Sequence, residues 1–88
     1  MTVPEAAEPP VLTAEQCRAA RRLLRWTRFD LALAAELRII SVLRLEGWWK
    51  PPEAKKIARL RRALEAGGVE FLPEDGVRLR ERPTEAAS

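Results

Sequence analysis

TRFDLALAAELRIISVLRLEG, residues 27–47, decides the fold because it holds two short helical patterns in close succession. Thr27, with Asp30 three residues later, has the spacing of an N-terminal capping box and predicts a helix over residues 28–35. The apolar spacing that follows predicts a second helix over residues 38–46. Gly47 ends this helix because glycine tolerates the backbone of a C-terminal cap.

Further helix signals flank this pair on both sides. Thr13 and Gln16 repeat the capping-box spacing and predict the start of a first helix. Cys17 belongs to the apolar face of that helix and is interpreted as a small buried side chain, since no base lies near it in the sequence. The arginines of this helix are expected to lie largely outside: Arg18, Arg21, Arg22 and Arg25. Pro51 and Pro52 fit only before or within the first turn of another helix, which we expect to run to about residue 66.

The last part of the chain has the pattern of a short hairpin. Apolar runs at residues 69–72 and 77–80 flank the turn sequence PEDG. An isolated hairpin is marginally stable, so it should pack on the helices or pair with another chain. The predicted organisation is a flexible arm (1–11), a helical domain (12–68), a C-terminal β-hairpin (69–82) and a flexible tail (83–88). The predicted fold class is mostly α, a bundle of four to five short helices with this hairpin.

Composition argues against most catalytic and metal-binding chemistry. The 88 residues include no His and one Cys, which removes imidazole bases, the usual zinc sites and an intramolecular disulfide. We therefore expect no catalytic residue, no metal site and no cofactor, and the chain is not predicted to be an enzyme. No apolar run approaches the roughly 18 residues needed to span a bilayer, and the acidic start is unlike a secretory signal. A cytoplasmic protein without a membrane partner is expected.

Positive charge is concentrated in the middle of the chain. Residues 15–66 carry thirteen Lys or Arg against six acidic residues, whereas the formal net charge of the whole chain is +3. Such a field would attract a polyanion such as nucleic acid. A set of solvated, arginine-rich helix faces would give the same composition, so charge alone leaves both interpretations open.

The spacing from Arg28 to Glu46 resembles the helix-turn-helix of the lambda-repressor-like (Xre) family of bacterial and phage regulators. Ala32 stands where that family keeps a small residue so that the two helices can touch. The apolar core positions of the family are occupied by Leu31, Ala35, Leu37, Val42 and Leu45. The ending ALEAGGVEF, residues 63–71, is similar to that of small stand-alone members, so the resemblance covers roughly residues 12–80.

This resemblance implies a transcription regulator that binds double-stranded DNA, with the third helix in the major groove and two subunits on two half-sites. Arg28 would lie near the sugar-phosphate backbone, and Arg44 could pair with guanine. Carried over by position, the DNA-contacting residues are Arg28, Arg38, Ile39, Ile40, Ser41, Arg44, Lys50, Lys55 and Lys56. Glu36 occupies the turn position that normally holds Gly, which predicts a strained left-handed backbone there.

Large apolar side chains gather around the same two helices. Besides Ile39 and Ile40, a possible interface comprises Phe29, Leu33, Leu43, Trp48 and Trp49. One explanation is contact with a second copy or another protein. The other is that the helices are rotated and some of these residues belong to the core, as is expected for Trp26. The first explanation gives an alternative function, a protein-interaction or dimerisation module that keeps the helix-turn-helix fold without binding DNA. The open hairpin edge adds to the expectation of a homodimer.

Overall fold

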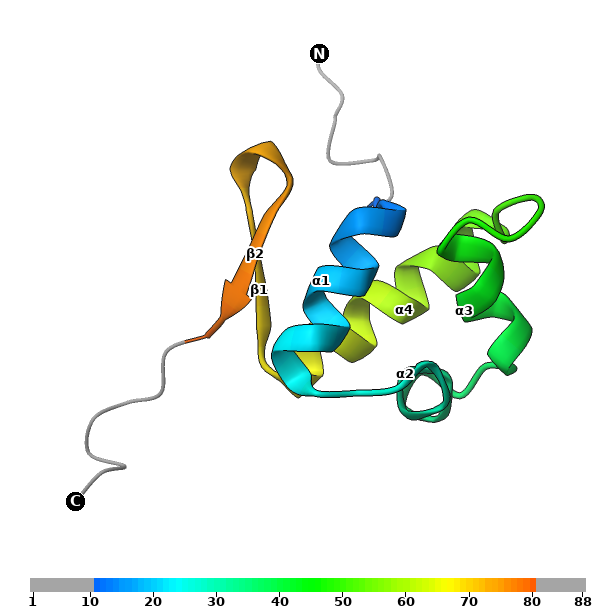
Figure 1. Ribbon diagram of the computed structural model, residues 1–88, viewed down its shortest axis with the longest axis horizontal. Helices are drawn as coiled ribbons and strands as arrows, with labels where there is room; N and C mark the ends of the chain where they lie inside the picture. Colours follow the sequence, from blue (N-terminus) through cyan, green and yellow to red (C-terminus); the bar gives the residue numbers. More distant parts are fainter. Residues whose placement is uncertain (1–10, 81–88) are drawn as a thin grey trace, which may run out of the picture.

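The computed structural model describes residues 11–80, which form four α-helices followed by a two-stranded antiparallel hairpin (Figure 1). The prediction of a mostly helical chain with a C-terminal hairpin is confirmed. The predicted arm and tail, apart from Val11, lie outside the described residues. The elements are α1 (Ala14–Leu24), α2 (Arg28–Ala35), α3 (Ile39–Leu45), α4 (Ala54–Gly67), β1 (Val69–Leu72), the 3-10 turn η2 (Pro73–Asp75) and β2 (Gly76–Leu79).

Two complete capping boxes set the starts of α1 and α2, as predicted. The Thr13 hydroxyl accepts a hydrogen bond from the Gln16 amide at 3.0 Å, and the Gln16 side chain accepts one from the Thr13 amide at 2.9 Å. Thr27 and Asp30 make the same pair of bonds at 3.0 and 2.8 Å. Each Thr cap contributes about 1 kcal/mol to stability. Arg38, at the N-cap of α3, makes no such side-chain bond.

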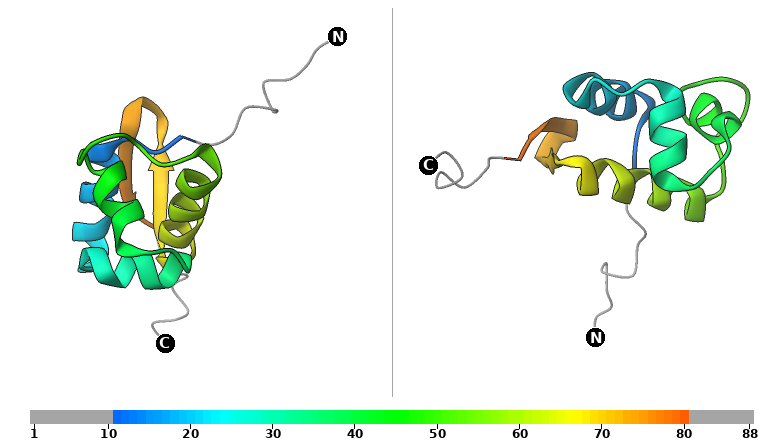
Figure 2. Two further views of the ribbon diagram at one scale, coloured as in Figure 1. Left: turned by 90° about the vertical axis from the view of Figure 1, so that its right-hand side faces the viewer. Right: turned by 90° about the horizontal axis from the view of Figure 1, so that it is seen from below.

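The elements occupy three successive regions along the long axis of the molecule, which do not follow their order in the sequence. The hairpin lies at one end, α1 and α4 occupy the middle, and α2 and α3 lie at the opposite end (Figures 1 and 2). Every one of these elements contributes to a single core, whose largest fully buried side chains are Leu31, Leu60, Leu64, Val42, Val69 and Cys17. The helices therefore hold α3 at a fixed place on the surface, far from the hairpin.

The hairpin packs on the helices instead of standing alone. Its antiparallel register pairs Val69 with Leu79 and Phe71 with Val77. Val69 is buried in the core, and Phe71 and Val77 pack against it, so these side chains share the face turned toward the helices. Within residues 11–80 each strand has one partner only, which leaves an open edge on both sides of the sheet.

Trp26 follows α1 and packs against the core, as predicted. Gly67, the last residue of α4, lies directly against its ring. A Cβ atom at Gly67 would lie 2.8 Å from the Cη2 atom of Trp26 and 3.1 Å from the Cδ1 atom of Leu24. The absence of a side chain at Gly67 is therefore what lets the indole lie over the end of α4.

Candidate functional site

α2 and α3 carry most of the residues predicted to contact a partner. They are joined by residues 36–38 and pack against each other, and both contribute buried side chains to the core, among them Ala32 and Val42. In Figure 1, α2 is seen nearly end-on, whereas α3 runs up the page. In the left view of Figure 2, α3 is upright and α2 is horizontal. The two helices therefore cross steeply, with α3 on the outside.

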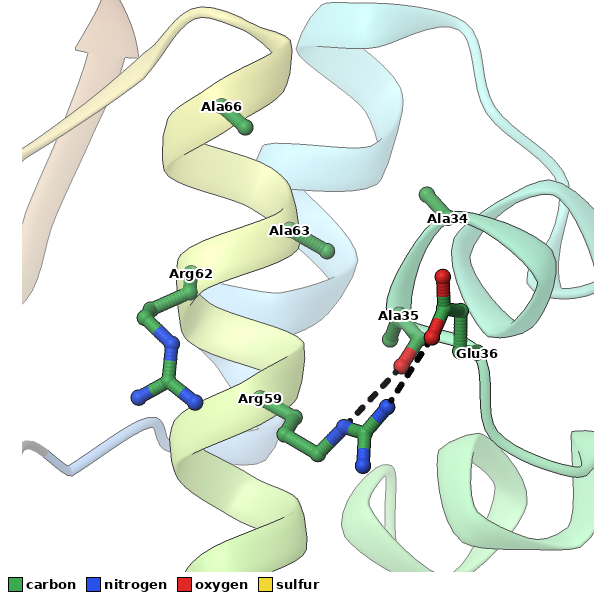
Figure 3. Close-up of a pocket in the computed structure, with 7 residues that line it drawn as sticks. All are labelled: Ala34, Ala35, Glu36, Arg59, Arg62, Ala63 and Ala66. Carbon is green, nitrogen blue, oxygen red and sulfur yellow. Dashed lines mark hydrogen bonds and ion pairs between the residues drawn. The ribbon is translucent and has the colours of Figure 1, made fainter.

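Glu36 adopts the left-handed backbone predicted for the turn, with φ of 59° and ψ of 44°. Its carboxylate faces Arg59 of α4 in a shallow notch between α2 and α4 (Figure 3). The Arg59 Nε donates to the Ala35 carbonyl oxygen at 3.2 Å, and its Nη2 lies 3.4 Å from Oε1 of Glu36. Both side chains of this ion pair are well exposed, so the pair itself contributes only about 0–1 kcal/mol.

The side chains of α3 divide between the core and the surface. Buried residues are Ser41, Val42 and Leu45; exposed residues are Arg38 (at the N-cap) and Ile40; half-buried residues are Ile39, Leu43 and Arg44. The expectation that Ser41 is exposed is wrong. It lies one helical turn before Leu45, so both point into the core. The outward surface of this region consequently consists of Arg38 and Ile40, flanked by Ile39, Leu43 and Arg44.

Arg28 was expected to be available to a phosphate, but it is engaged with a carboxylate. Its Nε lies 2.9 Å from Oε1 of Glu46, the residue that ends α3. The Arg28 side chain remains 48% exposed, whereas the Glu46 side chain is 3% exposed. Arg28 therefore lies at the surface, and its ion pair with buried Glu46 fixes the orientation of its side chain.

Glu46 is the centre of a buried network that the sequence analysis missed. The Arg21 Nε and Nη2 atoms approach its two carboxylate oxygens at 2.7 and 3.0 Å, and the Cys17 Sγ donates to Oε2 at 3.1 Å. The backbone oxygen of Glu46 also accepts from Arg18 at 2.8 Å. The expectation that Arg21 lies outside is wrong, since its side chain is 14% exposed. A usable signal was present: Arg21 follows Cys17 by one helical turn, which places it on the buried face of α1.

Protonation in this network follows from burial and hydrogen bonding. Burial by itself raises the pKa of Glu46, but the hydrogen bonds from Arg21, Cys17 and Arg28 outweigh it and lower the pKa below its ordinary value. The bond to Glu46 raises the pKa of Arg21. Burial, followed by the bond to Glu46, strongly raises the pKa of the Cys17 thiol. Cys17 is fully buried and stays a thiol, as expected of a packing residue.

The loop after α3 brings four predicted residues together. The Arg44 guanidinium carbon lies 4.8 Å from the centre of the Trp49 ring, and the Lys50 Nζ lies 5.4 Å from it. Trp48 meets Trp49 in a T-shaped contact, with ring centres 6.3 Å apart. The Nε of Arg44 is buried without a hydrogen-bond partner. The Arg44 guanidinium therefore lies over Trp49 beside Lys50. The pairing of Arg44 with guanine stays a prediction.

The remaining predicted contact residues lie near the start of α4. Lys55 is exposed and Lys56 is half-buried, both in its first turn. Both lysines follow the loop that begins at Glu46, so they flank α3 along the chain.

The predicted apolar interface is mostly at the surface. Exposed members are Phe29, Leu33, Ile40, Trp48 and Trp49, whereas Ile39 and Leu43 are half-buried. The alternative, that some of these side chains belong to the core, is therefore wrong for the five exposed residues. It is correct in part for Ile39 and Leu43, which are half-buried. Phe29 stands between two apolar grooves. One is lined by Arg21, Trp26, Thr27, Arg28, Phe29, Ile39 and Leu43, and the other by Phe29, Ala32, Leu33, Leu37, Arg38 and Ile39.

Known proteins give no further assignment. No family model matches the sequence, and no curated protein matches it significantly. Among residues 11–80, no three His, Cys, Asp or Glu side chains gather where a metal ion could be held. In the same part of the chain, every helix is too short or too polar to cross a bilayer.

Proposed function

We propose that this chain is a regulator that binds double-stranded DNA through a helix-turn-helix of the lambda-repressor-like type, with α3 entering the major groove. The observation that carries the proposal is the arrangement of α2 and α3. They are short, cross steeply (Figure 2), pack against each other, and leave the flank of α3 with Arg38 and Ile40 uncovered. A helix exposed in this way fits the width of the major groove.

The charges around α3 suit a DNA backbone. Arg38, Lys50 and Lys55 are exposed, and Arg28 is half-exposed at the start of α2. Glu46, an acidic residue close to these cations, is buried and paired with Arg21, so it presents little negative charge to a phosphate. Phosphate contacts of this kind position a protein on DNA, while Ile39 and Ile40 would contact thymine methyl groups.

Fluorescence anisotropy with a labelled random-sequence duplex tests this proposal. Affinity should fall as salt rises, with a slope of about −0.9 in log–log form for each phosphate contact. Replacing Arg38 and Lys55 together by Ala should reduce the magnitude of that slope by about 2. Arg80→Ala is the charge control, because Arg80 lies beside the hairpin at the opposite end of the molecule. Absence of binding at low salt, or equal losses in all variants, would contradict the proposal.

A second candidate is a protein-interaction or dimerisation module, supported by the exposed outer side of α2. Phe29 is 71% exposed and Leu33 79% exposed, next to the two apolar grooves. Exposed apolar side chains that gather on one surface mark protein-interaction sites, and Phe is enriched at interfaces. Sedimentation of the wild type and of a Phe29→Glu, Leu33→Glu variant tests this function. A dimer that dissociates in the variant supports it, and a monomer at every concentration speaks against self-association.

A further inference from the structure

The loop after α3 carries an aromatic and cationic cluster whose two indole rings have no part in the proposed duplex binding by α3. We define the Trp cluster as Trp48, Trp49, Arg44 and Lys50. We propose that the Trp cluster is a second nucleic-acid site, which stacks an unpaired base of single-stranded DNA on Trp48 and binds the adjoining phosphate through Arg44 and Lys50. This inference goes beyond the proposed function and stands independently of it.

The two indole rings are available to a ligand. Trp48 is 55% exposed and Trp49 is 65% exposed, so neither ring is used to fill the core. The rings make an angle of 63°, and such a T-shaped contact covers at most one ring face of the pair. The two cations lie over Trp49, not over Trp48. Trp48 is therefore the better platform for a planar group.

The backbone fixes the cluster in place. The Trp48 amide donates to the Leu43 carbonyl oxygen at 2.9 Å, which ties the loop to α3. Trp49 has a φ of 66°, in the left-handed region that a bulky side chain rarely adopts. The Arg44 guanidinium lies over Trp49 although its Nε is buried without a hydrogen-bond partner. Strained backbone and unpaired polar atoms of this kind, here at Trp49 and Arg44, are common at binding sites.

Charge selects the chemical class of the ligand. The aromatic pair already carries Arg44 and Lys50, so a third cation such as a quaternary ammonium would be repelled. A ligand that combines a flat aromatic ring with a negative charge satisfies both the free indole face and the cations. A nucleotide has this combination, and aromatic platforms beside cations are the usual means of binding single strands. Bases within a duplex are stacked on one another, so only an unpaired base can reach the ring.

Binding of a twelve-nucleotide thymidine oligomer tests the inference. Tryptophan fluorescence should be quenched, and anisotropy of the labelled oligomer should give an affinity that weakens with salt. Trp48→Ala should weaken binding about tenfold or more, whereas Trp48→Phe should retain much of it because a phenyl ring still stacks. Leu33→Ala is the matched control, an exposed apolar residue on α2 outside the cluster. Circular dichroism confirms that each variant is folded.

The competing outcomes are separable. Equal affinity of the wild type and Trp48→Ala would overturn the inference, as would equal binding of an oligomer of abasic sites, which offers phosphates without bases. Failure of the thymidine oligomer to bind at low salt would also overturn it. Loss of duplex binding in the Arg38→Ala, Lys55→Ala variant with retained oligomer binding supports two separate sites. Absence of duplex binding in the wild type contradicts the proposed function and leaves this inference in force if the oligomer binds.

Discussion

Replacement of Glu46 by Gln should destabilise the fold far more than any other single removal of a carboxylate among the described residues. The Glu46 side chain is 3% exposed and accepts hydrogen bonds from Arg21, Arg28 and Cys17. Gln keeps the shape and one acceptor oxygen but leaves the Arg21 guanidinium, 14% exposed, without its counter-ion. Breaking a buried ion pair costs about 3–5 kcal/mol, and we expect about 3 kcal/mol for this conservative change.

That loss is large for a domain whose free energy of unfolding is on the order of 5–10 kcal/mol. It corresponds to a fall in Tm of about 12–24 °C, since 1 kcal/mol shifts the Tm of such a domain by about 4–8 °C. Urea unfolding at pH 7, followed by circular dichroism, measures the loss in the free energy of unfolding. The matched control is Glu70→Gln, which removes an ion pair with Arg78 on the exposed side of the hairpin. The control should lose about 1 kcal/mol or less.

The same pair of proteins has a defined pH dependence. The pKa of Glu46 is lowered in the folded state, so its contribution is present above the ordinary value of 4.5 and is lost as pH falls through the folded value. The stability difference between the wild type and Glu46→Gln should therefore be full at pH 7 and shrink as the pH falls below the ordinary value of 4.5. A loss at pH 7 no larger than that of Glu70→Gln would refute the idea that Glu46 joins α1, α2 and α3.

Three further outcomes follow from single residues. Cys17 should resist Ellman's reagent in the native protein at pH 8 and react only on unfolding. Because the pKa of the Cys17 thiol is raised by folding, the free energy of unfolding should fall as pH rises above the unfolded thiol value of about 8.5. Glu36→Gly should raise the free energy of unfolding by about 1 kcal/mol, measured by urea unfolding, because glycine adopts the left-handed turn without strain. Gly67→Ala should lower it by about 1–2 kcal/mol, seen as a lower Tm, since the added methyl group meets the Trp26 ring.

Local signals in the sequence were sufficient to predict most of the secondary structure. The two Thr caps act within four residues of chain, so their effect is visible without knowledge of the fold. The same is true of the turn between the strands, where Pro73 and Gly76 are residue types that favour turns. The left-handed conformation of Glu36 was predicted from the resemblance, because the turn of that family normally holds Gly at this position.

The candidate site was harder to predict because its contacts join distant parts of the chain. Glu46 is 25 residues from Arg21 in sequence, and no local pattern pairs them. Ser41 was placed at the surface by its position in the resemblance, although it precedes the core residue Leu45 by one helical turn and is buried with it. The clustering of Arg44 and Lys50 on Trp49 depends on the path of the loop, which apolar periodicity does not describe.

The position of the hairpin has a consequence for how this protein can change over time. α1 and α4 stand between the hairpin and α3 (Figure 1), so the two ends of the molecule share the core but no surface. Substitutions on the outer face of the hairpin can change its surface while Val69 and Phe71 keep the hairpin packed against the helices. The helical end can then diverge at Arg38, Ile40 or the Trp cluster without a compensating change in the strands. One small chain can in this way evolve two specificities separately.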